Sequence, residues 1–155
     1  MTGTLLAHAL IKKGKSVQIF DEAHRGSSSQ VAAGIINPVT GRRVVKSWLI
    51  DELIPFAKKT YQDLETNLAA SFYHERKVTR ILFSIKEENL WLEKTGDALV
   101  EKYVTEGKGL GKFADKITEG EGVGEVQYSA QVDMPMFLEK SKEVFTQEGI
   151  LNVEK

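Results

Sequence analysis

The chain is 155 residues long, which is enough for one ordinary domain core. It is 41% apolar and 28% charged with a formal net charge of −1, a balance typical of soluble globular proteins. A net charge so close to zero provides no long-range attraction to nucleic acid or to anionic membranes, and we expect neither as a partner. The sequence contains no cysteine, which excludes disulfides and thiolate chemistry and is compatible with the cytoplasm, where we expect the protein.

The N-terminal apolar segment predicts a helix rather than a membrane span. The run Leu5–Ile11 is shorter than the roughly 20 residues that a span requires, and it lacks the basic region and cleavage site of a signal peptide. We therefore predict a helix over Thr2–Lys13 that Gly14 ends. Its apolar face is expected to carry Leu5, Leu6, Ala9 and Leu10.

The rest of the chain predicts short elements of both kinds. Strands are expected over Ser16–Phe20, Lys77–Ile85, Gly124–Val132 and Ile150–Val153. Helices are expected over Ser47–Leu68, Glu87–Lys94, Asp97–Tyr103 and Pro135–Glu148, and loops over 22–47, with a helical turn near Gln30–Gly34, and over 105–124. This order predicts an α/β fold in which a small parallel layer carries an inserted strand-rich lobe.

The longest predicted helix contains one residue that disfavours helical structure. Ser47 is a good N-cap, but Pro55 lies inside the helical pattern and should kink or break it. The inner face is expected to carry Leu49, Leu53, Phe56, Tyr61 and Leu64.

An acid at the end of the first predicted strand suggests a dinucleotide site. Asp21 lies 18 residues after Gly3, close to the spacing between the last glycine of a G-x-G-x-x-G fingerprint and the acid that binds the ribose. Met1 and Thr2 occupy the two positions before that glycine, and the two leading glycines have no counterpart. The spacing alone fits equally well a surface helix start followed by a capping acid.

The small residues that follow strengthen the cofactor interpretation. Gly26 to Ile36 leaves the backbone accessible, so that N–H groups and hydroxyls can approach a pyrophosphate or a flat ring. A polar loop in which serine hydroxyls stabilise turns is the alternative.

The segments together resemble a known family. The pattern of strand, acid and then Gly26-Ser27-Ser28-Ser29-x-x-Ala32-Ala33-Gly34-Ile35-Ile36-x-Pro38 resembles the FAD-dependent oxidoreductases of the D-amino-acid oxidase and glycine oxidase type. The run Ser129–Pro135 is similar to a segment of that family that precedes a helix. The resemblance covers nearly the whole chain, with a poorly matched middle from about 70 to 122, and it implies FAD as the cofactor.

The resemblance also implies which residues bind the cofactor. The turn at the pyrophosphate would be formed by Met1, Thr2 and Gly3, and hydroxyl groups would be supplied by Ser28 and Ser29. The ribose would be bound by Asp21 with Glu22, although the family more often has Glu at the first of these positions. The backbone of Ala33, Gly34 and Ile35 would lie against the flavin ring.

The resemblance implies a partial FAD-binding Rossmann-like layer whose first strand is missing, with part of an antiparallel substrate-domain sheet. The layer would comprise residues 1–45 and 133–155, and residues 46–132 would form the connecting helix and the substrate-domain part. Members of the family are considerably longer, so we expect a fragment truncated at both ends.

The implied activity is oxidation of a C–N bond in a small amine or amino acid, with hydride transfer to the flavin. The flavin performs this chemistry, and we name no catalytic residue in the chain. An NAD(P)-dependent dehydrogenase that shares the βαβ start, and a non-catalytic remnant or interaction module of the same fold, stay open as alternatives.

Other motifs point to no further chemistry. Gly107–Lys112 departs from a P-loop in its spacing and lacks the Ser/Thr that follows the lysine. The three histidines, His8, His24 and His74, are not spaced as metal ligands, and we predict no metal site. Arg42 and Arg43 could contact a phosphate or a carboxylate substrate, but most such pairs are solvated charges in a turn, and we favour that interpretation.

Overall fold

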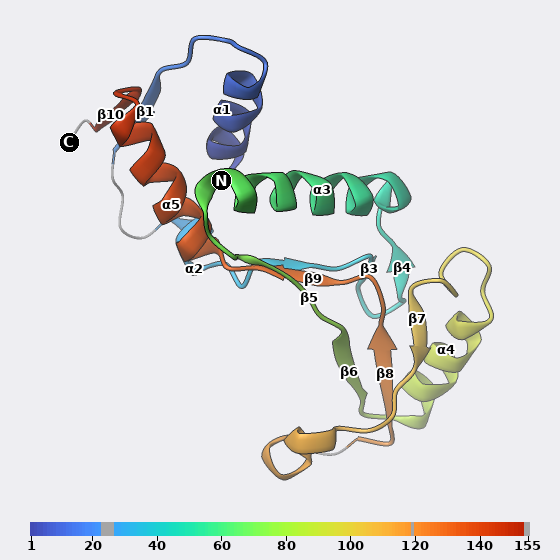
Figure 1. The fold of residues 1–155 in the computed structure, drawn as a ribbon. Coiled ribbons are helices and arrows are strands. Elements are labelled where there is room, and N and C mark those ends of the chain that lie inside the picture. Colours follow the sequence, from blue (N-terminus) through green and yellow to red (C-terminus); the bar gives the residue numbers. More distant parts are fainter. Residues whose placement is uncertain (23–26, 119, 154–155) are drawn as a thin grey trace. The chain divides into compact units, whose positions relative to one another are not determined.

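The fold is mixed α/β with several small sheets and divides into two compact units. The computed structural model describes residues 1–22, 27–118 and 120–153, and Figure 1 labels its elements. The first unit comprises Met1–Gly34, Tyr61–Tyr73 and Val132–Lys155, and the second comprises Ile35–Thr60 and His74–Gln131. The chain passes from one unit to the other between Gly34 and Ile35, and within α3 (Ile50–Leu68), β5 (Tyr73–Glu75) and β9 (Ala130–Val132).

The first unit contains a parallel pair of short strands. β1 (Ile19–Asp21) pairs with β10 (Leu151–Val153), and Ile19 lies opposite Leu151 (Figure 1). The unit also contains α1 (Thr2–Lys12), α2 (Ser28–Val31) and α5 (Met134–Gln147). The parallel pair joins the two segments that the sequence predicts as the strands of a small parallel layer, although β1 begins later than expected.

Aromatic side chains form the core of the first unit. Phe72 and Phe137 are fully buried with their ring centroids 5.2 Å apart, and Tyr61 meets both rings edge-on. The imidazole of His8 lies 4.6 Å from the ring of Phe145, which attaches α1 to α5. Three stretches of chain that are distant in sequence therefore share one core.

Side-chain caps define helix ends in this unit. Asp133 precedes α5, and its carboxylate accepts a hydrogen bond from the backbone N–H of Met136 at 3.1 Å. One Glu65 carboxylate oxygen accepts the N–H groups of Phe72 and Tyr73 at 2.6 and 2.7 Å, so α3 is tied to the chain that leaves it. Within the run Ser129–Pro135, Asp133 therefore serves as the N-cap of α5.

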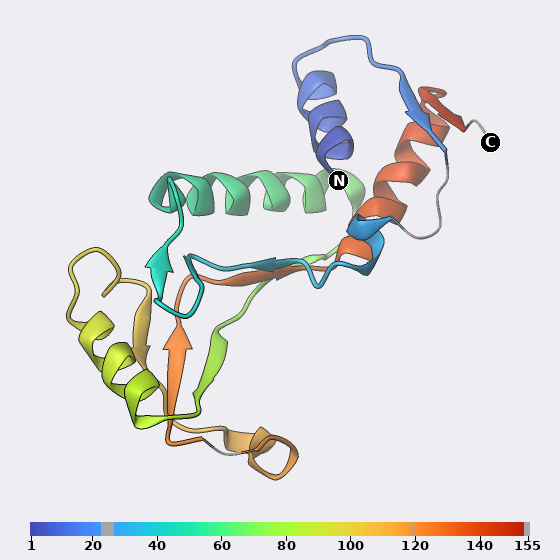
Figure 2. The same cartoon turned by 180° about the vertical axis from the view of Figure 1, so that it is seen from behind.

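The second unit contains an antiparallel sheet covered by a helix. β6 (Val78–Leu82) and β7 (Val104–Glu106) lie on either side of β8 (Gly122–Val126), and α4 (Ile85–Thr95) contacts all three strands (Figure 2). The remaining elements are β2 (Ile35–Ile36), the hairpin strands β3 (Val39–Thr40) and β4 (Val45–Lys46), and the 3₁₀ helix η1 (Gly111–Lys116). β2, β9 and β5 form another three-stranded sheet in the order β2-β9-β5, and β3 pairs with β4.

Trp91 of α4 is the centre of the second core. Its side chain is 2% exposed, and it belongs to a buried cluster with Leu82, Tyr103 and Val126. A Cβ atom added at Gly124 would lie 2.2 Å from the indole ring, so the strand can approach the indole only because that position is glycine.

Several predictions from the sequence are wrong. Asp97–Tyr103 forms turns rather than a helix. The strand expected over Gly124–Val132 is broken between β8 and β9, where Tyr128 takes a positive φ of 56°. The loop expected over 105–124 contains η1 and parts of β7 and β8, and the loop expected over 22–47 contains three short strands besides α2.

The long helix also differs from its prediction. α3 begins at Ile50 rather than after Ser47, and Pro55 lies inside it without ending it. Tyr61 and Leu64 are buried, but Leu53 and Phe56 are 44% and 70% exposed. The amphipathic pattern identifies an apolar face but not whether another segment covers it. In α1 the buried residue is Ala7, whereas Leu6 is 57% exposed.

None of the helices in the described ranges is long and apolar enough to cross a membrane.

The close approach of Gly124 to Trp91 gives a test of the second core. Gly124→Ala should lower the free energy of unfolding by about 1–3 kcal/mol, because the added methyl group overlaps the indole. Urea unfolding followed by tryptophan fluorescence measures this, since Trp48 and Trp91 both lie in the second unit. Gly96→Ala is the control, because its added Cβ would have only an ordinary contact at 3.8 Å, and an equal loss in both variants would contradict the assignment.

Candidate cofactor site

The start of α1 lies beside α2 in the first unit. Met1 is the N-cap of α1, and Thr2 and Gly3 form its first turn, where no side chain caps the backbone N–H groups. The Met1 nitrogen donates a hydrogen bond to Ser29 Oγ at 3.4 Å. The structure therefore brings together Met1 and Ser29, two of the residues that the family resemblance places at a pyrophosphate.

The two serines occupy the first turn of α2. Ser27 precedes that helix with extended backbone, and its side chain makes no capping hydrogen bond. Ser28 is exposed and Ser29 is half-buried. Hydroxyl donors and uncapped helix N–H groups thus gather at one end of the first unit, and this donor set suits a phosphate group.

Asp21 and Glu22 lie at the carboxyl end of β1. Asp21 is the last residue of the strand, opposite Val153 of β10, and both acidic residues are exposed. Ligands of open α/β folds bind outside the carboxyl ends of parallel strands, and both acids lie at that end of β1. Gly26 and His24 of the sequence motifs lie outside the described residues.

Gly34 has a structural reason to be glycine. Its φ is +67°, and an added Cβ would lie 1.9 Å from the carbonyl oxygen of Val132. The two backbones are also joined by a hydrogen bond of 2.9 Å from the Val132 N–H to the Gly34 oxygen. Because the backbone at this position passes so close to the backbone of β9, only glycine fits there, whether or not a ligand also lies nearby.

The residues flanking Gly34 leave apolar surface accessible. Ala33 is exposed, and Ile35, the first residue of β2, is 59% exposed. Val31 at the end of α2 is 78% exposed. Small and apolar exposed residues near the serines are compatible with a flat ring as the neighbour.

Gly3 does not show the close packing that the fingerprint predicts. An added Cβ at Gly3 would meet nothing within 4 Å among the described residues. The last glycine of a dinucleotide fingerprint permits close helix–strand packing, and that packing has no counterpart at Gly3 in the described chain.

The second unit contains an ion cluster that the sequence did not indicate. Asp51 pairs with Lys46 and accepts the phenol hydrogen bond of Tyr103, and Lys102 lies 3.6 Å away. Hydrogen bonds from Lys46 and then Tyr103 hold the pKa of Asp51 at about 2, while burial and then the hydrogen bond to Asp51 raise the pKa of Tyr103 to about 12. Both groups keep one protonation state near neutral pH, so the cluster acts as a tether between α3 and the turn before β7.

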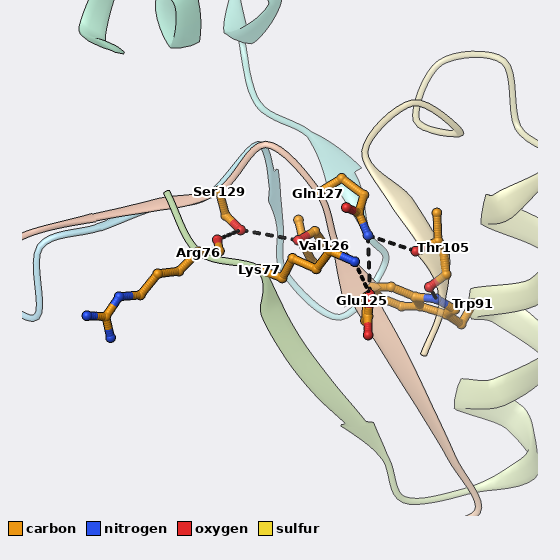
Figure 3. Close-up of polar contacts among 8 residues, drawn as sticks. All are labelled: Arg76, Lys77, Trp91, Thr105, Glu125, Val126, Gln127 and Ser129. Carbon is orange, nitrogen blue, oxygen red and sulfur yellow. Dashed lines mark hydrogen bonds and ion pairs between the residues drawn. The ribbon is translucent and has the colours of Figure 1, made fainter. Parts of the chain in front are cut away.

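A second network joins the strands around β8. Figure 3 shows Lys77 paired with Glu125 at 2.9 Å, and Gln127 donating to the Thr105 hydroxyl at 3.0 Å. The Lys77 hydrogen bond lowers the pKa of the Glu125 carboxyl. Ser129 donates to the Arg76 carbonyl at 2.6 Å, which fixes the chain where β8 ends. These contacts explain strand pairing and supply no reacting group.

The remaining motifs have structural roles. Gly107 continues the pairing beyond β7 by donating to the Val123 oxygen at 2.7 Å, and it opens no phosphate loop. Arg42 and Arg43 lie exposed in the turn between β3 and β4. Within the described residues, no group of three His, Asp or Glu side chains is placed to hold a metal ion.

Solved structures with a similar fold include an iminodiacetate oxidase and two L-amino acid deaminases. The chain resembles iminodiacetate oxidase (IdaA) from Chelativorans sp. BNC1 with a TM-score of 0.62 and 18% sequence identity. The match covers 99% of this chain and 44% of the oxidase chain. It also resembles L-amino acid deaminase from Proteus vulgaris with a TM-score of 0.63 and 15% sequence identity. That match covers 97% of this chain and 37% of the deaminase chain. L-amino acid deaminase from Proteus myxofaciens in complex with anthranilate has a TM-score of 0.62 and 17% identity, and the match covers 97% of this chain and 35% of that one.

These likenesses establish the fold. The chain spans less than half the length of each of these solved chains. No protein-family model and no curated protein sequence matches it.

The packing of α1 gives a pH-dependent prediction. His8 lies 3.0 Å from Ser141 Oγ, and burial lowers its pKa below the ordinary value of 6.5. As the pH drops from 6.5 toward the lowered pKa of His8 in the folded chain, the imidazole is more fully protonated in the unfolded chain than in the folded chain. Protonation therefore favours the unfolded chain, and the free energy of unfolding falls over this pH range.

Urea unfolding followed by circular dichroism at about pH 7.5 and about pH 5.5 tests this linkage. The wild-type chain should lose more stability between the two conditions than His8→Gln, which cannot titrate there. An equal loss in both proteins would show that His8 is not the group responsible.

Proposed function

We propose that the first unit is part of an FAD-binding layer and that the chain belongs to a flavin-dependent oxidoreductase that oxidises the C–N bond of a small amine or amino acid. The observation that carries the proposal is the contact between the start of α1 and Ser29, in a unit whose strand β1 ends in an acid. The likeness of nearly the whole chain to amine- and amino-acid-converting enzymes supports the choice of reaction.

The roles of the residues follow from their donors and acceptors. The first N–H groups of α1, at Met1, Thr2 and Gly3, and the hydroxyls of Ser28 and Ser29 would bind the pyrophosphate. Carboxylates accept hydrogen bonds from hydroxyls, so Asp21 and Glu22 would bind the adenosine ribose. The backbone of Ala33, Gly34 and Ile35 would lie against the flavin ring, and the residues on either side of Gly34 are exposed.

In this proposal the cofactor supplies the hydride acceptor, and the chain supplies orientation. Its own residues bind the pyrophosphate and ribose and hold the ring by the backbone around Gly34. No side chain of the chain is assigned a role as an acid, a base or a nucleophile.

The wider proposal concerns the arrangement of the parent enzyme. Residues 1–45 and 133–155 would belong to a Rossmann-like layer of the D-amino-acid oxidase or glycine oxidase type. Residues 46–132 would form the connecting helix and part of the substrate-domain sheet. The cysteine-free composition suits a reducing compartment, and the cytoplasm is the proposed location.

Ligand titrations can separate the proposed subsites. Flavin fluorescence should report binding of FAD, and NAD should not compete for it. Asp21→Asn should weaken FAD binding by about fivefold to tenfold, as expected for one lost hydrogen bond to a charged acceptor, but should leave FMN binding unchanged because FMN lacks the adenosine. Ser29→Ala should weaken binding of both flavins.

Matched controls address the fold of these variants. Asp115→Asn and Ser71→Ala alter exposed residues that belong to none of the proposed subsites, and both variants should bind both flavins as the wild type does. The assignment fails if FAD does not bind, if NAD binds in its place, or if Asp21→Asn affects FMN and FAD equally.

A further inference from the structure

Large apolar side chains around the start of α3 lie in solvent. Trp48 is 81% exposed and Phe56 is 70% exposed, and Leu49 and Leu53 are 42% and 44% exposed. Leu49, Leu53 and Phe56 follow one another at intervals of four and three residues, so they share one flank of the helix, and Trp48 directly precedes them. We call these four residues the α3 face. Exposed apolar patches larger than a few hundred Å² mark interaction surfaces.

A different flank of the same segment packs on the core of the second unit. Ile50 is buried in the cluster around Trp91, and Ile54 packs against that cluster. Residues 50–60 lie wholly in the second unit, so the α3 face belongs to that unit. A helix that is apolar on more than one flank is normally buried on each of them. In the described chain, the packing of α3 leaves this flank uncovered.

The backbone that carries the α3 face is held in place. The carbonyl oxygen of Leu49 accepts hydrogen bonds from the N–H groups of Glu52 at 3.1 Å and of Leu53 at 2.9 Å. Trp48 is therefore attached to an ordered turn. Binding through an ordered surface costs less conformational entropy than binding through a loop that must first be ordered. Tryptophan is also among the residue types most enriched at interface hot spots.

The charged residues beside the α3 face suit a second copy of the chain in antiparallel orientation. Glu52 and Lys59 are exposed, lie about two helical turns apart and form no ion pair with another described residue, whereas their neighbours Asp51 and Lys58 each pair within the chain. A two-fold axis that passes midway between Glu52 and Lys59, next to Phe56, brings Glu52 of each copy opposite Lys59 of the other. The flank is therefore complementary in charge to itself.

The area of the α3 face fits a weak, reversible dimer. Two aromatic side chains such as Trp48 and Phe56 bury roughly 300 Å² or more per copy. The two leucines and the flanking charged residues add to this area, and each partner in a standard interface buries about 800 Å². Interfaces at the lower end of the size range belong to weak complexes, and we expect a dissociation constant on the order of 10 µM.

We propose that the chain forms a symmetric dimer through the α3 face, with the two copies of α3 antiparallel. A two-fold axis uses the same surface on both copies, so association stops at two chains. The dimer goes beyond the proposed flavin function and does not require it. Its test therefore uses the flavin-free 155-residue chain.

Sedimentation equilibrium between about 1 and about 300 µM should show a reversible conversion from monomer to dimer. Over the upper part of this range, the indole Nε1–H signal of Trp48 in amide NMR spectra should shift with concentration, whereas that of Trp91, which is 2% exposed, should stay fixed. A chain that remains monomeric throughout would assign the face to a different polypeptide and overturn the proposal. A dimer that leaves the Trp48 signal unmoved would also overturn it.

A pair of matched variants tests the apolar part of the interface. Phe56→Ser should weaken dimerisation by about tenfold or more, because it removes the side chain next to the two-fold axis. Phe83→Ser is the control, since Phe83 is 62% exposed in the same unit but lies between β6 and α4. The amide spectrum shows whether each variant is folded. Equal dimerisation by the two folded variants would contradict the proposal.

A charge exchange tests the antiparallel arrangement and does not depend on the outcome for Phe56→Ser. Glu52→Lys or Lys59→Glu alone places like charges opposite each other at both ends of the interface and should weaken the dimer by about fivefold or more at low salt. The double variant E52K/K59E restores opposite charges and should dimerise about as tightly as the wild type. A double variant that binds no more tightly than either single variant would rule out the proposed dimer.

Discussion

The contact between Phe72 and Phe137 is the constraint on which the first unit depends. Both side chains are fully buried, and they join a segment after α3 to the helix that precedes β10. α1 then attaches to α5 through His8 and Phe145. The start of α1, the serines of α2 and the end of β1 are therefore positioned by a core built from three distant stretches of chain. Removal of that core would separate the groups that we assign to one cofactor.

The second unit depends on a different interaction, the close packing of the Trp91 ring against Gly124. Because Gly124 has no side chain, Trp91 can lie flat on β8, and its indole N–H reaches the backbone of β7. The guanidinium of Arg80 lies 5.8 Å from the centre of the same ring. The absence of a side chain at Gly124 thus determines how the core of this unit packs around Trp91.

Sequence patterns predicted the elements whose signals are local. Gly14 and Gly149 both adopt positive φ at helix ends, so the ends of α1 and α5 could be located within about two residues. The parallel pairing of β1 with β10 also follows the expected order of elements. The break at Tyr128 could not be predicted, because a tyrosine with positive φ is held by tertiary contacts rather than by local preference.

The candidate sites likewise combine features that the sequence indicates with contacts that only the tertiary structure determines. The family resemblance pointed to Ser29 and Asp21 from their order along the chain, but the proximity of Met1 to Ser29 is a tertiary fact. Asp51 and Tyr103, or Arg80 and Trp91, carry no motif, because their partners are set by sheet register and helix packing. Exposure of Leu53 and Phe56 likewise depends on what covers a helix, which its own pattern does not encode.

The central claim is that the first unit holds FAD. The most direct measurement is an absorbance spectrum of the purified chain after addition of FAD and removal of the unbound cofactor by desalting. The account predicts that flavin bands near about 370 and about 450 nm stay with the protein. A colourless protein after desalting would contradict it.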